Sequence, residues 1–418
     1  MKFKRFICAI LIAPGAALSA QHAAPTPTPL ATLLAEAEAN NSQLQAADDA
    51  WKAQAHVARQ LTALPDPQFS VESLGVGSPK PFAGFTNSEF AYVGLGASQD
   101  LPYRGKLKLR GEVATRDTET EKAGANVVRS LIAEQVKLLY LQIAYSIGAI
   151  AYIDRADSLL QSLIQDALLQ YSVGKGAQSS VIKAQMEHTR LLREDTVHRM
   201  DLSEAQARLK QLLHRSQQTP DILPEPLTAT PLLKAPQELE GQLRAQNPAL
   251  RMDADAVQKQ DAQVASANRE RLPDFNVGYN VELTGDGYRN RYVLSASMRL
   301  PNRSRVAAEI AQASQQEIRA KHLMDFDAQQ KLAELQEQLV AANSTAELLK
   351  EYNDGLIPQA EALFHSEQSA YQSNKQDLAP VLSALLDILT LQNECQQVLR
   401  DHETALVKIE TLTGGSLR

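Results

Sequence analysis

The stretch Gln99-Asp-Leu-Pro-Tyr-Arg-Gly-Lys106 joins two different sequence patterns. Before it, apolar and polar residues alternate with the period of two that indicates a β-strand; after it, apolar residues recur every three or four positions, as on one face of a helix. A similar junction, Arg299-Leu-Pro-Asn-Arg303, follows about two hundred residues later. One unusual junction that occurs twice predicts two copies of one structural unit.

The first predicted unit spans residues 21–218 and contains one β-hairpin. A helix over 30–64 is expected to end at Pro65-Asp-Pro67. Alternation then predicts strands at about 68–74 and 90–101, with a Gly- and Pro-rich turn between them.

The second predicted unit, residues 237–418, repeats this plan after a proline-rich linker at 219–236. A helix is expected over 239–272, followed by strands at about 275–283 and 291–300. The sequence therefore predicts a mainly α-helical fold with a small β part, built from two tandem helix–β-hairpin–helix repeats.

Each unit also contains an unusually long helix. The first runs from Lys106 to about Tyr171 and returns over 179–214, and the second spans about Ser304–Glu351 or beyond. At ~1.5 Å per residue the first helix would be roughly 100 Å long, more than an ordinary globular domain. Its middle carries an apolar stripe of Val128, Ile132, Val136, Leu139, Ile143, Ile147 and Ile150. The second helix has the heptad spacing of a coiled coil at Leu332, Leu335, Leu339, Ala342, Ala346 and Leu349.

The two units match most closely at the far ends of these helices. Four residues recur at a constant offset of 200: Tyr171, Lys175, Val181 and Ala184 correspond to Tyr371, Lys375, Val381 and Ala384. Gly174 corresponds to Asn374, and these two residue types best tolerate the left-handed conformation that ends a helix. Both units are therefore expected to end in the same helical hairpin turn.

Residues 1–20 have the pattern of a cleaved export signal. Three cations, Lys2, Lys4 and Arg5, precede an apolar run, and Ala17-Leu-Ser-Ala20 resembles a cleavage site. Removing these cations leaves 39 of the 42 Lys and Arg against 49 Asp and Glu, so the mature chain is at about −10. Such acidity argues against nucleic-acid binding, which depends on neutralising phosphates.

The remaining composition excludes several other classes. Only Cys395 follows the signal, so no internal disulfide can form. Beyond the signal no uninterrupted run of 18 apolar residues occurs, and we expect no membrane-spanning helix. The eight histidines are scattered and lack the close spacing of metal ligands. We predict no catalytic, cofactor-binding or metal-binding residue, and hence no enzyme.

Four strands in one chain pose a problem of closure, because four strands cannot close a barrel and isolated hairpins are only marginally stable in water. Three chains would supply twelve strands, an even number suited to an outer-membrane barrel without lipid-exposed edges. The long helices would then continue the wall as a tube.

This arrangement resembles the TolC-type outer-membrane efflux factors. The resemblance covers the duplicated plan over the mature chain, and three short motifs carry it: Tyr-x-Val-Gly at 171–174, Asn-Pro-x-Leu at 247–250 and Leu-Thr-Gly at 412–414. It implies a homotrimer in the outer membrane of a Gram-negative bacterium, with a twelve-stranded barrel in lipid and a long periplasmic α-helical barrel. Ser98 to Leu107 looks most like members that serve heavy-metal pumps.

The resemblance also implies partners and a passive transport function. Family members are exit ducts of tripartite pumps, opened by a periplasmic adaptor protein and an inner-membrane transporter, here expected to be of the RND type. The cargo would include heavy-metal cations. Two alternatives within the fold are drug export and type I polypeptide export. A periplasmic adaptor or a coiled-coil structural protein is a further alternative, although neither explains two matched pairs of strands.

The predicted site residues follow from the same resemblance. The tips that meet the adaptor would be Val173, Gly174, Lys175, Asn374 and Lys375. The helices that narrow the tunnel mouth would place Ser180, Lys183, Pro380 and Ser383 there, with Asp377 and Asp387 flanking them. Better-known members carry an acidic ring at some of these positions, and this chain does not. We therefore expect packing and hydrogen bonds to hold the entrance shut, and divalent ions to block it poorly.

Overall fold

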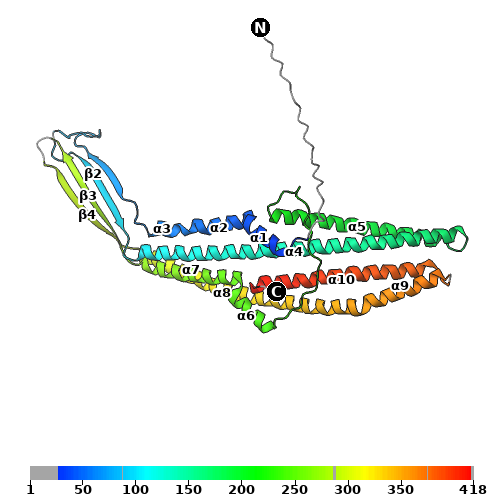
Figure 1. Cartoon of the computed structure of the whole chain (residues 1–418). Coiled ribbons are helices and arrows are strands. Elements are labelled where there is room, and N and C mark those ends of the chain that lie inside the picture. Colours follow the sequence, from blue (N-terminus) through cyan, green and yellow to red (C-terminus); the bar gives the residue numbers. More distant parts are fainter. Residues whose placement is uncertain (1–26, 87, 286–288, 374, 416–418) are drawn as a thin grey trace, which may run out of the picture.

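The computed structural model describes residues 27–86, 88–285, 289–373 and 375–415. They form a long rod of helices with a four-stranded sheet at one end (Figure 1). The predicted signal at 1–20 lies outside the described residues.

The first half of the chain contains two strands and five helices in the described residues. In chain order they are α1 Leu30–Asn40, α2 Ser42–Ala55, α3 Val57–Thr62, β1 Gln68–Leu74, β2 Tyr92–Leu101, α4 Lys106–Ser172 and α5 Gln178–Leu212. The second half repeats the plan of helices, two strands and long helices. Its elements are α6 Pro236–Gln246, α7 Pro248–Arg269, β3 Asp274–Thr284, β4 Arg291–Arg299, α8 Arg303–Glu351, a π-helix Tyr352–Leu356, α9 Ile357–Gln372 and α10 Leu378–Thr413.

The expected helices over 30–64 and 239–272 were wrong in one respect, because both are broken. An asparagine in a non-helical conformation interrupts each: Asn41 precedes α2, and Asn247 precedes α7 with Pro248 in its first turn. The first helix is interrupted again at His56, between α2 and α3. The side-chain oxygens of both asparagines accept hydrogen bonds from backbone N–H groups in the first turn of the following helix. This N-capping favours the start of a new helix over continuation of the preceding one. β2 also starts two residues later than predicted, because the chain is still turning where Ala91 N–H bonds to Ser88 O.

These two asparagines also tie the start of each half to its end. The side-chain amide of Asn41 donates to Leu212 O at 2.9 Å, and that of Asn247 donates to Leu412 O at 2.8 Å. The following turns are equivalent as well, since His214 and Gly414 both adopt positive φ, at 56° and 65°. The Leu-Thr-Gly ending at 412–414 therefore closes the second half against its own first helix pair.

The sheet is antiparallel, with strand order β1-β2-β3-β4 and two distinct faces. One cross-strand row is Val71, Leu95, Val281 and Tyr292, and the adjacent row on the other face is Glu72, Gly94, Glu282 and Arg291. The two faces follow the period of two from which the strands were predicted. Phe69 is 81% exposed and Leu294 is 76% exposed, so the apolar face is uncovered in a single chain. Within the described residues the outer edges of β1 and β4 have no strand neighbour.

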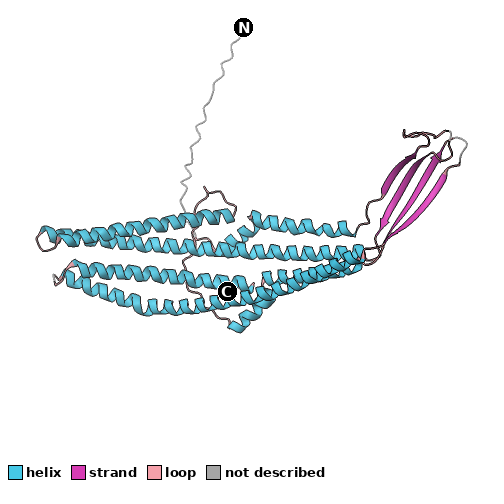
Figure 2. Cartoon of the chain, turned by 180° about the vertical axis from the view of Figure 1, so that it is seen from behind, coloured by secondary structure: helices cyan, strands magenta, loops and turns pink. Residues whose placement is uncertain are grey.

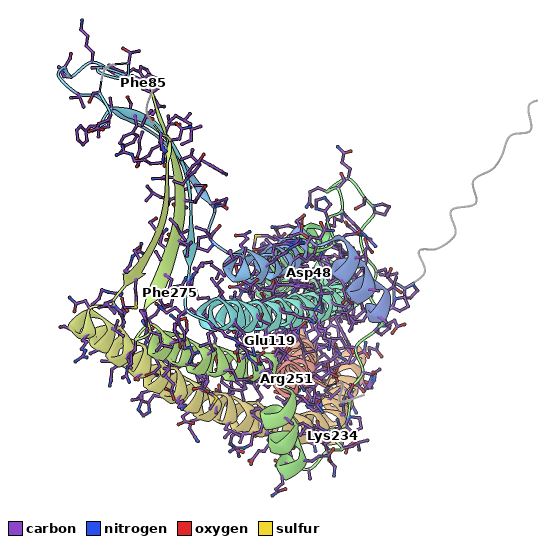
Figure 3. The ribbon with its side chains drawn as sticks, turned by 90° about the vertical axis from the view of Figure 1, so that its left-hand side faces the viewer. Asp48, Phe85, Glu119, Lys234, Arg251 and Phe275 are labelled. Atoms are coloured by element: carbon purple, nitrogen blue, oxygen red, sulfur yellow. The ribbon has the colours of Figure 1, made fainter. Side chains whose placement is uncertain are left out.

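The fold-deciding stretch 99–106 is held by residues from the second half. Lys106 is 2% exposed, and its ammonium lies 3.0 Å from Glu270 Oε2 and 2.9 Å from Asp274 Oδ1. The N–H of Tyr103 also donates to Asp274, at 3.0 Å. Figure 3 shows Phe275 at this base of the sheet and Phe85 near its far end. The junction therefore locks the two halves together where sheet becomes rod.

Three apolar clusters fill the rod. One lies under α1, α2, α4 and α5, a second joins α6, α8 and α10, and a third unites both hairpins at the end away from the sheet. The predicted stripe on α4 faces inward, with Val136 and Ile143 fully buried. The heptad pattern on α8 is buried at Leu335, Leu339, Ala342 and Leu349, but Ala346 is exposed in the single chain.

The expectation that no helix could span a membrane needs one correction. By length and composition alone, α4 contains a sufficiently apolar window, with a mean hydropathy of 1.5, of which 44% is buried. Residues such as Val136, Ile143 and Ser146 in this part of α4 are buried against neighbouring helices, as expected for a core helix.

Candidate functional site

The candidate site is the end of the rod opposite the sheet, where two helical hairpins turn (Figure 2). In the first turn the N–H of Lys175 bonds to Gln170 O at 2.9 Å; in the second, the N–H of Lys375 bonds to Ala370 O at 2.9 Å. Gly174 takes the left-handed conformation at φ 73°, as the sequence predicted. Asn374 lies outside the described residues. The matched bonds give both described lysines the same backbone anchor.

A shared core supports the two turns. Leu160 and Leu163 of α4, Val181 and Ala184 of α5, and Val381, Leu382 and Leu385 of α10 lie in one apolar cluster with Phe364 of α9. Val181 and Val381, and likewise Ala184 and Ala384, are related by the offset of 200 seen in the sequence. The hairpins therefore form one packed unit rather than two independent arms.

A groove of about 580 Å³ lies between the turns, and we call it the tip groove. Its lining residues come from both hairpins: Ala167, Gln170, Lys175, Gly176, Ala177, Ser180, Tyr371, Lys375, Gln376, Asp377 and Leu378. The structure thus brings together four predicted site residues, Lys175, Ser180, Lys375 and Asp377.

The other described site residues among those predicted do not line the tip groove. Val173 is 65% exposed in the turn. Lys183 on α5, and Pro380, Ser383 and Asp387 on α10, are exposed on the helix surfaces beyond it. Which of them face a tunnel depends on neighbouring chains, so their role as gate residues stays a prediction.

The electrostatics of the tip groove are set by few groups. Lys175 and Lys375 supply two ammonium groups, and Asp377 supplies the one carboxylate among the described lining residues. Burial and the nearby charge of Asp166 raise the pKa of Tyr371, whose hydroxyl therefore stays neutral. No group of three or more His, Cys, Asp or Glu that could hold a metal ion occurs in the described part of the chain.

Sequence reasoning missed the π-helix that separates α8 from α9. Its Tyr352 hydroxyl donates to Glu394 Oε2 on α10 at 3.0 Å. Gly355 and Pro358 were the available signals, since both weaken regular helix. The residue at the corresponding offset in the first half, Tyr152, lies within the uninterrupted α4.

Several solved structures have the same architecture as this chain. CusC, studied for folding and transmembrane channel formation, matches with a TM-score of 0.79 and 17% identity, over 93% of this chain and 92% of that chain. The outer-membrane channel OprN matches with a TM-score of 0.80 and 16% identity, over 93% and 90%. The outer membrane protein VceC from the bacterial pathogen Vibrio cholerae matches with a TM-score of 0.77 and 16% identity, over 93% and 97%.

The fold is that of outer-membrane channel proteins. The predicted mainly α-helical class with a small β part is confirmed, and so is the resemblance to TolC-type efflux factors at the level of the fold. A search with protein-family models found no match, and a sequence search of curated proteins also found none.

Proposed function

We propose that this protein is the outer-membrane exit duct of a tripartite efflux pump. The observation that carries the proposal is a two-faced sheet at one end of a helical rod, whose outer edges have no strand neighbour among the described residues, in a fold shared with outer-membrane channels. A duct needs no catalytic residue and no cofactor, and we propose none.

The sheet accounts for assembly and membrane insertion. Unpaired β1 and β4 edges are costly in lipid, where water cannot satisfy backbone groups. Pairing β4 of one copy with β1 of the next closes a twelve-stranded barrel in a homotrimer. The row containing Val71 and Tyr292 would face lipid, and the row containing Glu72 and Arg291 would face the lumen. The helices would continue as a periplasmic tube.

The proposed partners come from the resemblance to TolC-type efflux factors. The tips at Val173–Lys175 and Lys375, with Asn374, would meet a periplasmic adaptor, and an inner-membrane transporter of the RND type would supply the energy. We favour heavy-metal cations as cargo because of the stretch 98–107; drugs or polypeptides are the alternatives. A periplasmic adaptor or structural coiled coil is disfavoured by the apolar face of the sheet.

One preparation tests this proposal. The mature protein, extracted in detergent, is measured by light scattering and then for conductance in a planar bilayer. A trimer with small resting currents supports a closed duct. A water-soluble monomer that needs no detergent would overturn it. Metal and drug sensitivity of a deletion strain then separates the cargo classes.

The same bilayer experiment tests the proposed gate. Because the candidates Ser180, Lys183, Pro380 and Ser383 carry no carboxylate, and only Asp377 and Asp387 flank them, calcium should block the current weakly. Strong block by millimolar divalent ions would refute a gate held by packing and hydrogen bonds.

A further inference from the structure

We propose that Glu72 of one copy pairs with Arg299 of the next copy, and that this ion pair sets the register of the seam between β1 and β4 of neighbouring copies. The inference rests on the proposed function, because that function supplies the twelve-stranded barrel in which the seam occurs. It specifies what the barrel alone leaves open, namely how far one copy is shifted along the next.

The two outer strands carry opposite charges on the polar face of the sheet. Glu72 is the one charged residue of β1, and it is exposed. β4 has no acidic residue and carries an arginine at each end, Arg291 and Arg299. Glu282 binds Arg291 at 2.9 Å, whereas neither Glu72 nor Arg299 has a hydrogen bond or ion pair with another described residue. Each outer strand therefore presents one charge without a direct partner.

Arg299 lies near other charged groups of its own chain, at the base of the sheet. These groups already have direct partners: Asp274 accepts from Lys106 at 2.9 Å, Asp100 accepts from Asn276 at 2.8 Å, and Arg110 is bound to Glu270 at 2.8 Å. Glu72 of the next copy would supply the direct partner that Arg299 lacks.

The chain itself limits the registers of the seam. Glu72 and Arg291 belong to one cross-strand row, so an unshifted seam would set Arg291 beside Glu72 of the next copy. Any shift must be an even number of residues, because an odd shift would join the apolar face of one copy to the polar face of the next. A shift of β4 away from the rod is excluded, because it would bring the end of β4 beside α3, which is helical.

Barrel geometry selects among the even shifts toward the rod. Four strands spaced ~4.8 Å apart span about 19 Å of the wall, and each residue of shift adds ~3.3 Å along the strands. Shifts of four, six and eight residues per chain therefore give strand tilts of about 35°, 45° and 55°. Because outer-membrane barrels have tilts of about 35–45°, shifts of four and six fit and a shift of eight does not.

The two charges distinguish a shift of six from a shift of four. At six, Ser297 lies opposite Glu72, and Arg299 is its diagonal neighbour, about 7–8 Å away and within reach of long side chains. At four, Arg299 lies about 13 Å along the strand from the position opposite Glu72, too far for an ion pair. A shift of six also sets Val71 beside Met298 on the apolar face, where they are 75% and 53% exposed in the single chain. The six-residue shift therefore satisfies the tilt and the charges together.

Disulfide cross-linking tests the register without altering either charge. The full mature chain, in outer-membrane vesicles, carries V71C/A296C, V71C/M298C or V71C/L300C, which report shifts of four, six and eight. Copper-phenanthroline oxidises the vesicles, and a non-reducing gel measures the covalent trimer. We expect V71C/M298C to give the highest yield, since a disulfide requires Cα atoms about 4.4–6.8 Å apart. The single variant V71C gives the background, and the native Cys395 is buried.

Charge variants in the V71C/M298C background test the ion pair. E72R should lower the yield about threefold, because a like-charge pair replaces an attractive one, and E72R/R299E should restore it. E240R makes the same charge change at an exposed position of α6 and should leave the yield unchanged. The highest yield from V71C/A296C or V71C/L300C, or no rescue by E72R/R299E, overturns the inference.

The proposed function is scored separately, on the detergent-extracted mature protein. A conducting trimer that cross-links best at another shift would refute the ion pair and leave the duct standing. A monomer without conductance would refute the duct itself.

Discussion

Replacing Asn247 by alanine should destabilise the protein by about 2–4 kcal/mol, because this side chain performs two tasks. It caps α7 by accepting the N–H of Leu250 at 3.0 Å, and it donates to Leu412 O at the end of α10 at 2.8 Å. Losing a cap costs about 1 kcal/mol. Leaving a buried acceptor unsatisfied costs a further ~1–3 kcal/mol, and Asn247 is only 4% exposed.

Two other asparagines provide the comparison. Asn41 makes the equivalent pair of contacts in the first half, so N41A should cost a similar amount. Asn302 caps α8 through the N–H groups of Ser304 and Arg305, is exposed, and makes no side-chain hydrogen bond to a distant helix in the described part of the chain. N302A should therefore cost only about 1 kcal/mol.

Guanidinium unfolding followed by far-UV circular dichroism measures all three variants, and hydrogen exchange at the end of α10 localises the effect. We expect faster exchange near Leu412 in N247A and unchanged exchange there in N302A. If N247A costs no more than N302A, the bond that closes each half is not a source of stability, and the reasoning fails.

Three further changes test the junction, the turn and the shared core. Lys106→Met should cost about 2–3 kcal/mol by thermal unfolding at pH 7, below the usual range for a broken buried pair because Glu270 and Asp274 keep other donors. Burial raises the pKa of Glu270, but hydrogen bonds from Arg110 and Lys106 outweigh burial, so the pKa is lowered overall. The ionised Glu270 therefore stabilises the folded state above the unfolded pKa of 4.5, and this stabilisation is lost as pH falls through the lowered pKa. The difference in stability between wild type and K106M should narrow in acid. Gly174→Ala should destabilise the protein by about 1 kcal/mol and speed amide exchange in the turn, because alanine is strained at a φ of 73°. No neighbouring atom would clash with the added Cβ, so backbone strain is the sole cause expected. Unchanged exchange would argue against left-handed strain. Leu382→Ala, fully buried in the tip core, should lower stability by about 2–5 kcal/mol in guanidinium unfolding, and a loss below 1 kcal/mol would contradict a shared core.

Much of the fold was predictable because local patterns and final contacts agree. Alternation predicted where the strands lie, and the strand register adds that Val71, Leu95 and Val281 share one cross-strand row. The breaks at Asn41 and Asn247 were harder, because apolar periodicity continues across them; a capping preference marks both, and Pro248 adds a second signal at Asn247.

The candidate site was predictable in part for a physical reason. The turns depend on local residues, and Gly174 and the offset of 200 located them. The tip groove depends on how two distant hairpins pack, which no local pattern reports, so its pairing of Lys175 with Lys375 emerged only in three dimensions. The predicted place of Lys183 and Ser383 at a tunnel mouth stays a prediction, because no contact within the single chain tests it.

The interruption between α8 and α9 has a consequence for symmetry. From Arg303 to Gln372 the second arm has three residues more than the uninterrupted α4, or ~4.5 Å of extra path between the same two ends. Figure 1 shows α8 and α9 bowing while α4 runs straight. A tube built from such chains would alternate straight and curved helices around its wall. Its rotational symmetry would therefore equal the number of chains and not twice that number. Any partner that encircles the tips would then meet two inequivalent contact points per chain.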